Sequence, residues 1–218
     1  GKTTIINLIC RFYDAQRGEV LIDGVNGKDY NKRELREMLG LVLQDVFLFA
    51  GSVLENLRLG NAEISDSQVR RGAELAGAAP FIEKLEGGFQ APVAERGATF
   101  STGQKQLIAF ARALAYDPKI LILDEATANI DSETEALIQQ AIENSMRGRT
   151  TVAVAHRLST IRHADMILVL DHGEIVERGS HDELIKQQGK YYRLYTLQFQ
   201  EETTKKRSSG RTPSTKLA

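Results

Sequence analysis

Short apolar runs alternate with helical patterns along the chain, and several of these runs are apolar at consecutive positions. Strands with that pattern are buried on both faces, as in a parallel sheet covered by helices. The clearest candidates are Val20 to Asp23, Leu41 to Gln44, Ile120 to Leu123, Thr151 to Ala155 and Met166 to Leu170. The pattern therefore predicts an α/β fold with a mostly parallel sheet flanked by helices.

Helical spacing dominates the stretch between the second and third strand candidates. Apolar residues recur at this spacing in two groups, first Val69, Ala73 and Ala76, and then Leu107, Ile108, Ala111 and Leu114. The second group falls on one face of a helix and is predicted to pack in the core. We expect a helical subdomain over about residues 56–115 within a domain of residues 1–200.

The end of the chain and the overall charge limit the possible partners. Residues 201–218 are polar and basic and have nothing to pack, so we expect a disordered, solvated tail. Lys and Arg number 28 against 29 Asp and Glu, so no global basic field favours nucleic acid. The single Cys10 excludes an internal disulfide, and no apolar run reaches the roughly 18 residues that cross a bilayer. These features are typical of a cytosolic segment.

The first residues, Gly1-Lys2-Thr3-Thr4, are followed by a helical pattern. They match the end of a P-loop, whose Lys reaches the β- and γ-phosphates and whose hydroxyl binds Mg²⁺. A simple capped helix start explains four residues equally well.

Polar residues follow three of the strand candidates. Asp124 and Glu125 end the run Ile120 to Leu123, Gln44 ends the second candidate, and His156 follows the fourth. In open α/β sheets, ligands bind beyond the carboxyl ends of the strands. Asp124 is suited to hold the Mg²⁺ of a nucleotide, and Glu125 to activate the attacking water.

Ser101-Thr102-Gly103-Gln104 begins the helix that carries the second apolar group. Its Ser can cap the helix, and its Gly lets backbone amides approach a ligand. The sequence therefore predicts a second anion site at this helix N-terminus.

Three segments together resemble ATP-binding cassette (ABC) proteins. Ser101 to Gln106 resembles their signature motif, Asp124 to Thr127 their Walker B motif, and Ala155-His156-Arg157 their switch histidine. Gln44 to Asn56 is similar to the Q-loop region of exporters, and Glu95-Arg96-Gly97 to the exporter X-loop that touches the membrane domain. The resemblance runs from Gly1 to about Gln200.

This resemblance implies a P-loop NTPase fold that binds ATP and Mg²⁺, with the signature motif on the helical subdomain. The residues implied for the phosphates are Gly1, Lys2, Thr3 and Thr4, and those implied for the metal are Thr3, Gln44 and Asp124. The residues implied for catalysis are Gln44, Glu125 as the base and His156 at the γ-phosphate. Those implied for the shared nucleotide are Ser101, Gly103, Gln104 and Asp131.

The family further implies two such domains paired head to tail, as a homodimer or heterodimer, with each ATP between the P-loop of one and the signature motif of the other. Their closure moves a transmembrane domain, which places the chain at the cytoplasmic face of the cell membrane. Phe100, Thr102 and Ala128 depart from the usual motifs, but Glu125 and His156 are both present, so we do not interpret the site as degenerate.

The Gly-rich turn and first strands that the family carries before this point are not in the sequence. We therefore interpret the chain as cut within the P-loop and expect it to bind ATP poorly alone. The alternatives are a soluble ABC ATPase, the separate ATPase subunit of an importer, and a non-catalytic ATP clamp. The exporter-like segments disfavour the first two, and Glu125 disfavours a clamp, which needs no base.

Overall fold

The computed structural model describes residues 1–43, 45–124, 132–146, 148–154 and 161–197. The chain forms two compact units. Among the described residues, one unit covers residues 2–154 and the other joins Gly1 to residues 161–197.

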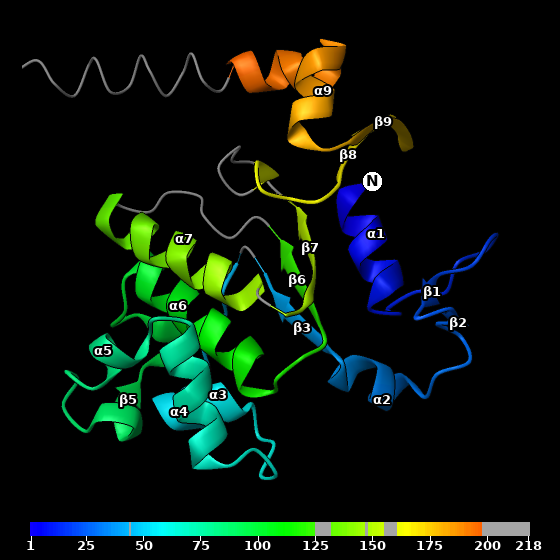
Figure 1. Cartoon of the computed structure of the whole chain (residues 1–218). Helices are drawn as coiled ribbons and strands as arrows, with labels where there is room; N and C mark the ends of the chain where they lie inside the picture. The colour runs from blue at the N-terminus through cyan, green and yellow to red at the C-terminus, as the bar shows by residue number, and fades with distance from the viewer. Residues whose placement is uncertain (44, 125–131, 147, 155–160, 198–218) are drawn as a thin grey trace, which may run out of the picture. The chain divides into compact units, whose positions relative to one another are not determined.

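A parallel sheet forms the centre of the first unit (Figure 1). Its strands are β3 (Leu39–Val42), β6 (Ile120–Asp124) and β7 (Thr150–Val154), in the order β3-β6-β7. The central β6 pairs Leu123 with Val42 of β3 and Asp124 with Val154 of β7. All three strands therefore end at the same edge, and the predicted parallel pairing is confirmed for them.

Different helices cover the two faces of this sheet (Figure 1). They are α1 (Lys2–Ile9) on one face, and α6 (Thr102–Ala115) and α7 (Ser132–Met146) on the other. Consecutive residues of β6 point to opposite faces, so Ile122 packs with α1 and Leu123 joins the core formed with α6 and α7. This double covering explains why the strands are apolar at consecutive positions.

The helices α3 (Val53–Arg58), α4 (Asp66–Leu75) and α5 (Ala79–Ile82) lie in the stretch predicted to be helical. α4 packs closely on α6, because Gly72 brings the two backbones together: a Cβ built at Gly72 would lie 2.7 Å from the carbonyl oxygen of Ala111. The predicted core face of α6 is confirmed by the burial of Leu107, Ile108, Ala111 and Leu114.

Short elements complete the first unit. They are β1 (Leu21–Ile22), β2 (Val25–Asn26), α2 (Lys32–Glu37), β4 (Gly51–Ser52), η1 (Gly88–Gln90), β5 (Pro92–Val93) and η2 (Glu95–Gly97). β1 pairs antiparallel with β2, and β4 with β5. The predicted strand at Val20 to Asp23 is therefore one arm of a small hairpin.

The second unit contains the antiparallel hairpin β8 (Ile167–Asp171) and β9 (Glu174–Gly179), helix α9 (His181–Gln187) and a further helical stretch over residues 190–197. Its core is formed by Ile167, Val169, Leu184 and Tyr191. β9 was not predicted, because most of its residues are exposed and they form no apolar run. Among helices in the described ranges, none has both the length and the apolar character needed to cross a membrane.

Candidate nucleotide-binding site

Asp124 is the last residue of β6 and lies at the carboxyl edge of the parallel sheet. Ile120 and Ile122, respectively four and two positions earlier, pack on the α1 side of the sheet. Because side chains alternate along a strand, the Asp124 carboxylate continues that same face. It is partly exposed, so an ion from solvent can reach it.

The direction of α1 relative to the strands follows from contacts at its C-terminal end. Arg36 lies in α2, immediately before β3, and its guanidinium donates to the backbone oxygens of Cys10 (3.5 Å) and Arg11 (3.2 Å). The C-terminal end of α1 therefore lies where β3 begins. α1 has eight residues, or about 12 Å, which is close to the length of β3. The N-terminus of α1 thus lies at the edge where the strands end, on the face of Asp124.

Lys2, Thr3 and Thr4 form the first turn of α1 and are all exposed. That turn contains no acidic residue, so the positive end of the helix dipole is not neutralised from within the helix. Backbone amides, an ammonium group and two hydroxyls here suit a phosphate group. The structure therefore brings the P-loop candidates and Asp124 to the same corner of the sheet.

A hydroxyl from Thr3 and a carboxylate from Asp124 are hard oxygen donors, which suit Mg²⁺. In the described ranges, no three His, Cys, Asp or Glu side chains gather into a metal site. Mg²⁺ does not require such a cluster, since it keeps several waters and binds through one or two protein groups plus phosphates. The residues present therefore fit the ion.

Four candidates lie outside the described residues: Gln44, Glu125, Asp131 and His156. Their roles stay predictions. Gly1 directly precedes α1 and is exposed, but its contacts group it with the second unit.

The signature segment starts α6 with a reciprocal capping box. The Ser101 hydroxyl accepts a hydrogen bond from the Gln104 amide (3.2 Å), and the Gln104 side-chain oxygen accepts one from the Ser101 amide (3.0 Å). The predicted cap is confirmed. Within α6, the amides of Thr102 and Gly103 belong to the first turn and have no intrahelical acceptor. This helix N-terminus can therefore receive an anion.

α1 and α6 cover opposite faces of the sheet, so the structure does not combine all the candidates in one pocket. Lys2, Thr3 and Asp124 share one face. Ser101 and Gln104 belong to the helix on the other face. The structure therefore places these two groups of candidates on opposite sides of the sheet.

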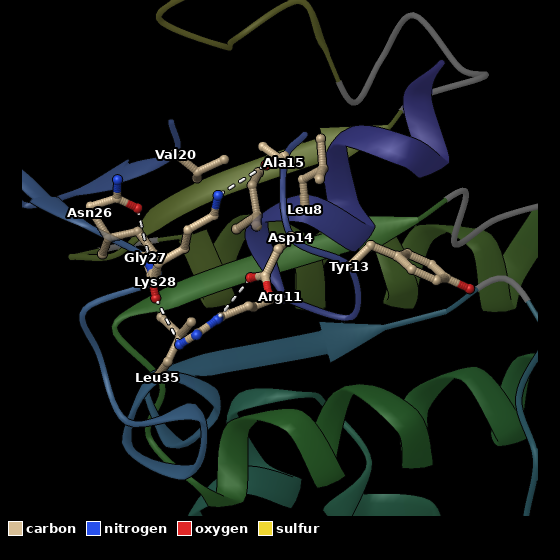
Figure 2. A pocket seen from close by; sticks show the side chains of 12 residues that line it. Leu8, Arg11, Tyr13, Asp14, Ala15, Val20, Asn26, Gly27, Lys28 and Leu35 are labelled. Atoms are coloured by element: carbon tan, nitrogen blue, oxygen red, sulfur yellow. Dashed lines mark hydrogen bonds and ion pairs between the residues drawn. The ribbon is translucent and has the colours of Figure 1, made fainter. Parts of the chain in front are cut away.

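A small hollow below α1 is structural and does not belong to the nucleotide site (Figure 2). Arg11 donates to the backbone oxygens of Gly27 (3.1 Å) and Tyr30 (2.8 Å) and pairs with Asp14, while Lys28 donates to the Ala15 oxygen (3.0 Å). The space is only about 20 Å³, close to the size of one water. These cations fasten the β1-β2 hairpin to the end of α1.

The loop before α3, within the segment similar to the Q-loop region, carries two aromatic rings whose exposure the sequence did not predict. Phe47 is 49% exposed and Phe49 is 54% exposed, with ring centroids 4.9 Å apart, while Leu48 between them is fully buried. An open hollow of about 350 Å³ adjoins them, lined by Phe49, Ala50, Glu55, Asn56, Leu59 and Gly60. Exposed rings of this kind, one of them lining the hollow, suit a contact with another protein or domain. The sequence signals were the similarity of Gln44 to Asn56 to the exporter Q-loop region and the apolar run Val46 to Ala50, a pattern that fits a core position equally well.

Comparison with known proteins gives matches over most of the chain. The family model described as "ABC transporter" matches residues 1–128. The chain is 54% identical to the "Probable multidrug resistance ABC transporter ATP-binding/permease protein YheH" of Bacillus subtilis, over 91% of the chain and 29% of that protein. It is 49% identical to "ABC transporter B family member 21" of Arabidopsis thaliana, over 91% of the chain and 15% of that protein.

A solved structure gives the same result. "Structure of a bacterial Atm1-family ABC exporter with ATP bound" matches with a TM-score of 0.83 and 41% identity, over 91% of this chain and 35% of that one. The chain therefore spans roughly a third or less of the proteins it resembles. It belongs to the ABC transporter family and corresponds to the nucleotide-binding domain of the exporter type.

Proposed function

We propose that the chain binds Mg²⁺-ATP at the corner formed by α1 and the end of β6, and that it hydrolyses this ATP to drive an exporter. The observation that carries the proposal is that the N-terminus of α1 and the Asp124 carboxylate lie on one face and at one edge of the sheet. Positive and negative groups held together in this way suit a nucleotide with its metal.

The proposed roles follow from the groups available. Gly1, Lys2 and Thr4 hold phosphate oxygens, and Thr3 and Asp124 bind Mg²⁺. The ion supplies charge that offsets the developing charge on the phosphates. Gln44 assists at the metal or its water, Glu125 deprotonates the attacking water, and His156 contacts the γ-phosphate.

We propose that Ser101, Gly103 and Gln104 serve the ATP bound by a second copy or a relative, with Asp131 linking the two sites. Support comes from the capping box, which fixes the first turn of α6 while its next amides have no acceptor within the helix. It also comes from the opposite faces on which α1 and α6 lie. Head-to-tail pairing of two chains would complete both half-sites.

The exposed rings of Phe47 and Phe49, with the hollow beside them, are proposed to contact a transmembrane domain. Gly97 of the X-loop segment lies directly on Leu48, so the segment implied to touch the membrane domain adjoins the loop that carries these rings. This supports an exporter held at the cytoplasmic face of the membrane over a soluble ABC ATPase or a separate importer subunit.

Residues 1–200 are proposed as one nucleotide-binding domain with a helical subdomain near 56–115. The proposed disordered tail, 201–218, lies outside the described residues.

The test compares Glu125→Gln with Glu74→Gln in the complete transporter. Glu74 is an exposed carboxylate of α4, so its substitution makes the same chemical change away from the site. Loss of a general base lowers turnover by about a hundredfold or more, and ATP affinity changes little. Radiolabelled phosphate release measures turnover, and filter binding measures affinity. Equal turnover in the Glu125→Gln and Glu74→Gln variants would contradict the catalytic assignment.

A further inference from the structure

The loop over residues 45–52 exposes its aromatic rings, yet its backbone is held by a buried side chain. Asn56 of α3 is only 2% exposed. Its Nδ2 donates to the backbone oxygens of Phe49 (2.9 Å) and Ser52 (3.0 Å), and its Oδ1 accepts from the Phe49 amide (2.9 Å). Asn56 thus satisfies both backbone groups of Phe49, just before the short β4-β5 pairing begins at Gly51.

Arg112 of α6 completes the arrangement from the other side. Its Nε donates to the Asn56 backbone oxygen (2.9 Å), its Nη1 to the Phe47 oxygen (3.1 Å), and its Nη2 to Asn56 Oδ1 (3.3 Å). One guanidinium therefore joins the loop, the end of α3 and α6. The planar fork of Arg can make these bonds together, and the point charge of Lys cannot.

The charge of Arg112 is balanced in an unusual way. Within the described residues no carboxylate forms an ion pair with it, and its three acceptors are neutral oxygens. Burial lowers the pKa of Arg112, against a smaller opposing effect of Tyr116. The Asn56 carbonyl belongs to the last turn of α3, where the helix dipole favours a cation. Burying a cation without an acidic partner costs free energy. We therefore infer that the loop geometry fixed by Arg112 has a function.

A second contact holds the same loop. Gly97 has φ +62°, and a Cβ built there would lie 2.7 Å from Cδ1 of Leu48. Gly97 lies four residues before Ser101, the N-cap of α6. The loop is therefore held at Leu48 by the segment entering α6, and at Phe47 by Arg112 within α6.

We propose that Arg112 is a positioning residue that fastens the loop over residues 45–52 to the signature helix α6, so that displacement of Ser101 by a nucleotide displaces Phe47 and Phe49 with it. The proposal rests on the proposed function for the identity of the nucleotide site and of the partner surface. It gives α6 a direct mechanical path to that surface that does not pass through Gln44.

The local part of the proposal is tested by amide hydrogen exchange on this chain, comparing Arg112→Met with Arg149→Met. Arg149 is the matched control, since it also bonds two backbone oxygens, of Pro118 (3.0 Å) and Ser145 (3.2 Å), elsewhere in the same unit. The Phe49 amide should exchange about tenfold faster in Arg112→Met, because Asn56 loses its support. In Arg149→Met that amide should keep its protection, and Arg112→Lys should not restore it. Equal acceleration in both Met variants, or none in Arg112→Met, would overturn the link.

The functional part uses the complete transporter and measures ATP turnover and transport separately. Arg112→Met should retain most ATP turnover while transport per ATP falls by about fivefold or more, the range of ordinary coupling between sites. Arg149→Met should change both together. If turnover and transport fall in proportion in Arg112→Met, the residue is merely structural and the inference fails. A wild-type transporter that hydrolyses no ATP would refute the proposed function instead, while the exchange result would still decide the link.

Discussion

Replacing Gly72 by alanine tests how closely α4 approaches α6, the helix that carries the signature segment. An added Cβ would lie 2.7 Å from the oxygen of Ala111, 2.7 Å from the nitrogen of Ala115 and 2.9 Å from its Cα. All three are backbone atoms, so no side chain can rotate away. Overpacking of this kind costs about 1–3 kcal/mol. Against it stands the better helix propensity of Ala, about 1 kcal/mol. Since three contacts are violated, we expect a net loss of about 1–2 kcal/mol in the free energy of unfolding.

Urea unfolding of the chain measures this loss. With an m-value of about 2 kcal/mol per molar, the middle of the usual range, the midpoint should fall by about 0.5–1 M, and further in Gly72→Val. The pair Arg71→Gly and Arg71→Ala calibrates propensity in α4, because Arg71 is exposed on the same helix. In that pair Ala should be the more stable. If Gly72→Ala raises the midpoint as Ala does at position 71, the helices do not make this close contact.

Two further substitutions test charge at helix starts. Gln104→Glu keeps a capping box but adds a negative charge where a phosphate is proposed to bind. The stability of the fold should therefore be retained, while ATP-dependent pairing of the complete transporter, measured by light scattering, should weaken. Unchanged pairing would count against Ser101 and Gln104 as a nucleotide contact. Hydrogen bonds from the Ser180 amide and hydroxyl lower the pKa of Glu183 below its ordinary 4.5. The capping box of α9 therefore stabilises the fold fully above pH 4.5, and this contribution is lost as the pH falls through the lowered pKa. Carboxyl NMR should give a midpoint below 4.5 that rises in Ser180→Ala, and an unchanged midpoint would contradict this cause.

Periodicity predicted the sheet because both of its faces are covered. Residues such as Ile122 and Leu123 are apolar for independent reasons, one facing α1 and the other facing α6. A strand buried on both faces can therefore be predicted from its apolar run. β9 could not be predicted, because an exposed hairpin strand is held by its hydrogen bonds to β8, and these require no apolar pattern in the sequence.

The sequence predicted those residues of the candidate site that lie in local motifs. Lys2, Asp124 and Ser101 were found from local motifs, and the corner shared by the first two follows from parallel strand ends. Asn56 and Arg112 were not identified, because an Asn beside apolar neighbours and an Arg on an amphipathic helix are ordinary in sequence. Their importance arises only from hydrogen bonds between residues 56 positions apart.

The burial of α6 gives it the properties of a rigid connection. Its side chains from Gln106 to Ala111 are all buried, and helices pack against it along its length. From Ser101 to Arg112 the helix covers about three turns, or roughly 16 Å. A packed interior does not deform continuously, so displacement at one end of such a helix must appear at the other. An exposed helix would bend and absorb it. If a phosphate binds at Ser101 as proposed, the same packing that makes α6 a core element would transmit its displacement to Phe47, provided that Arg112 keeps the loop attached.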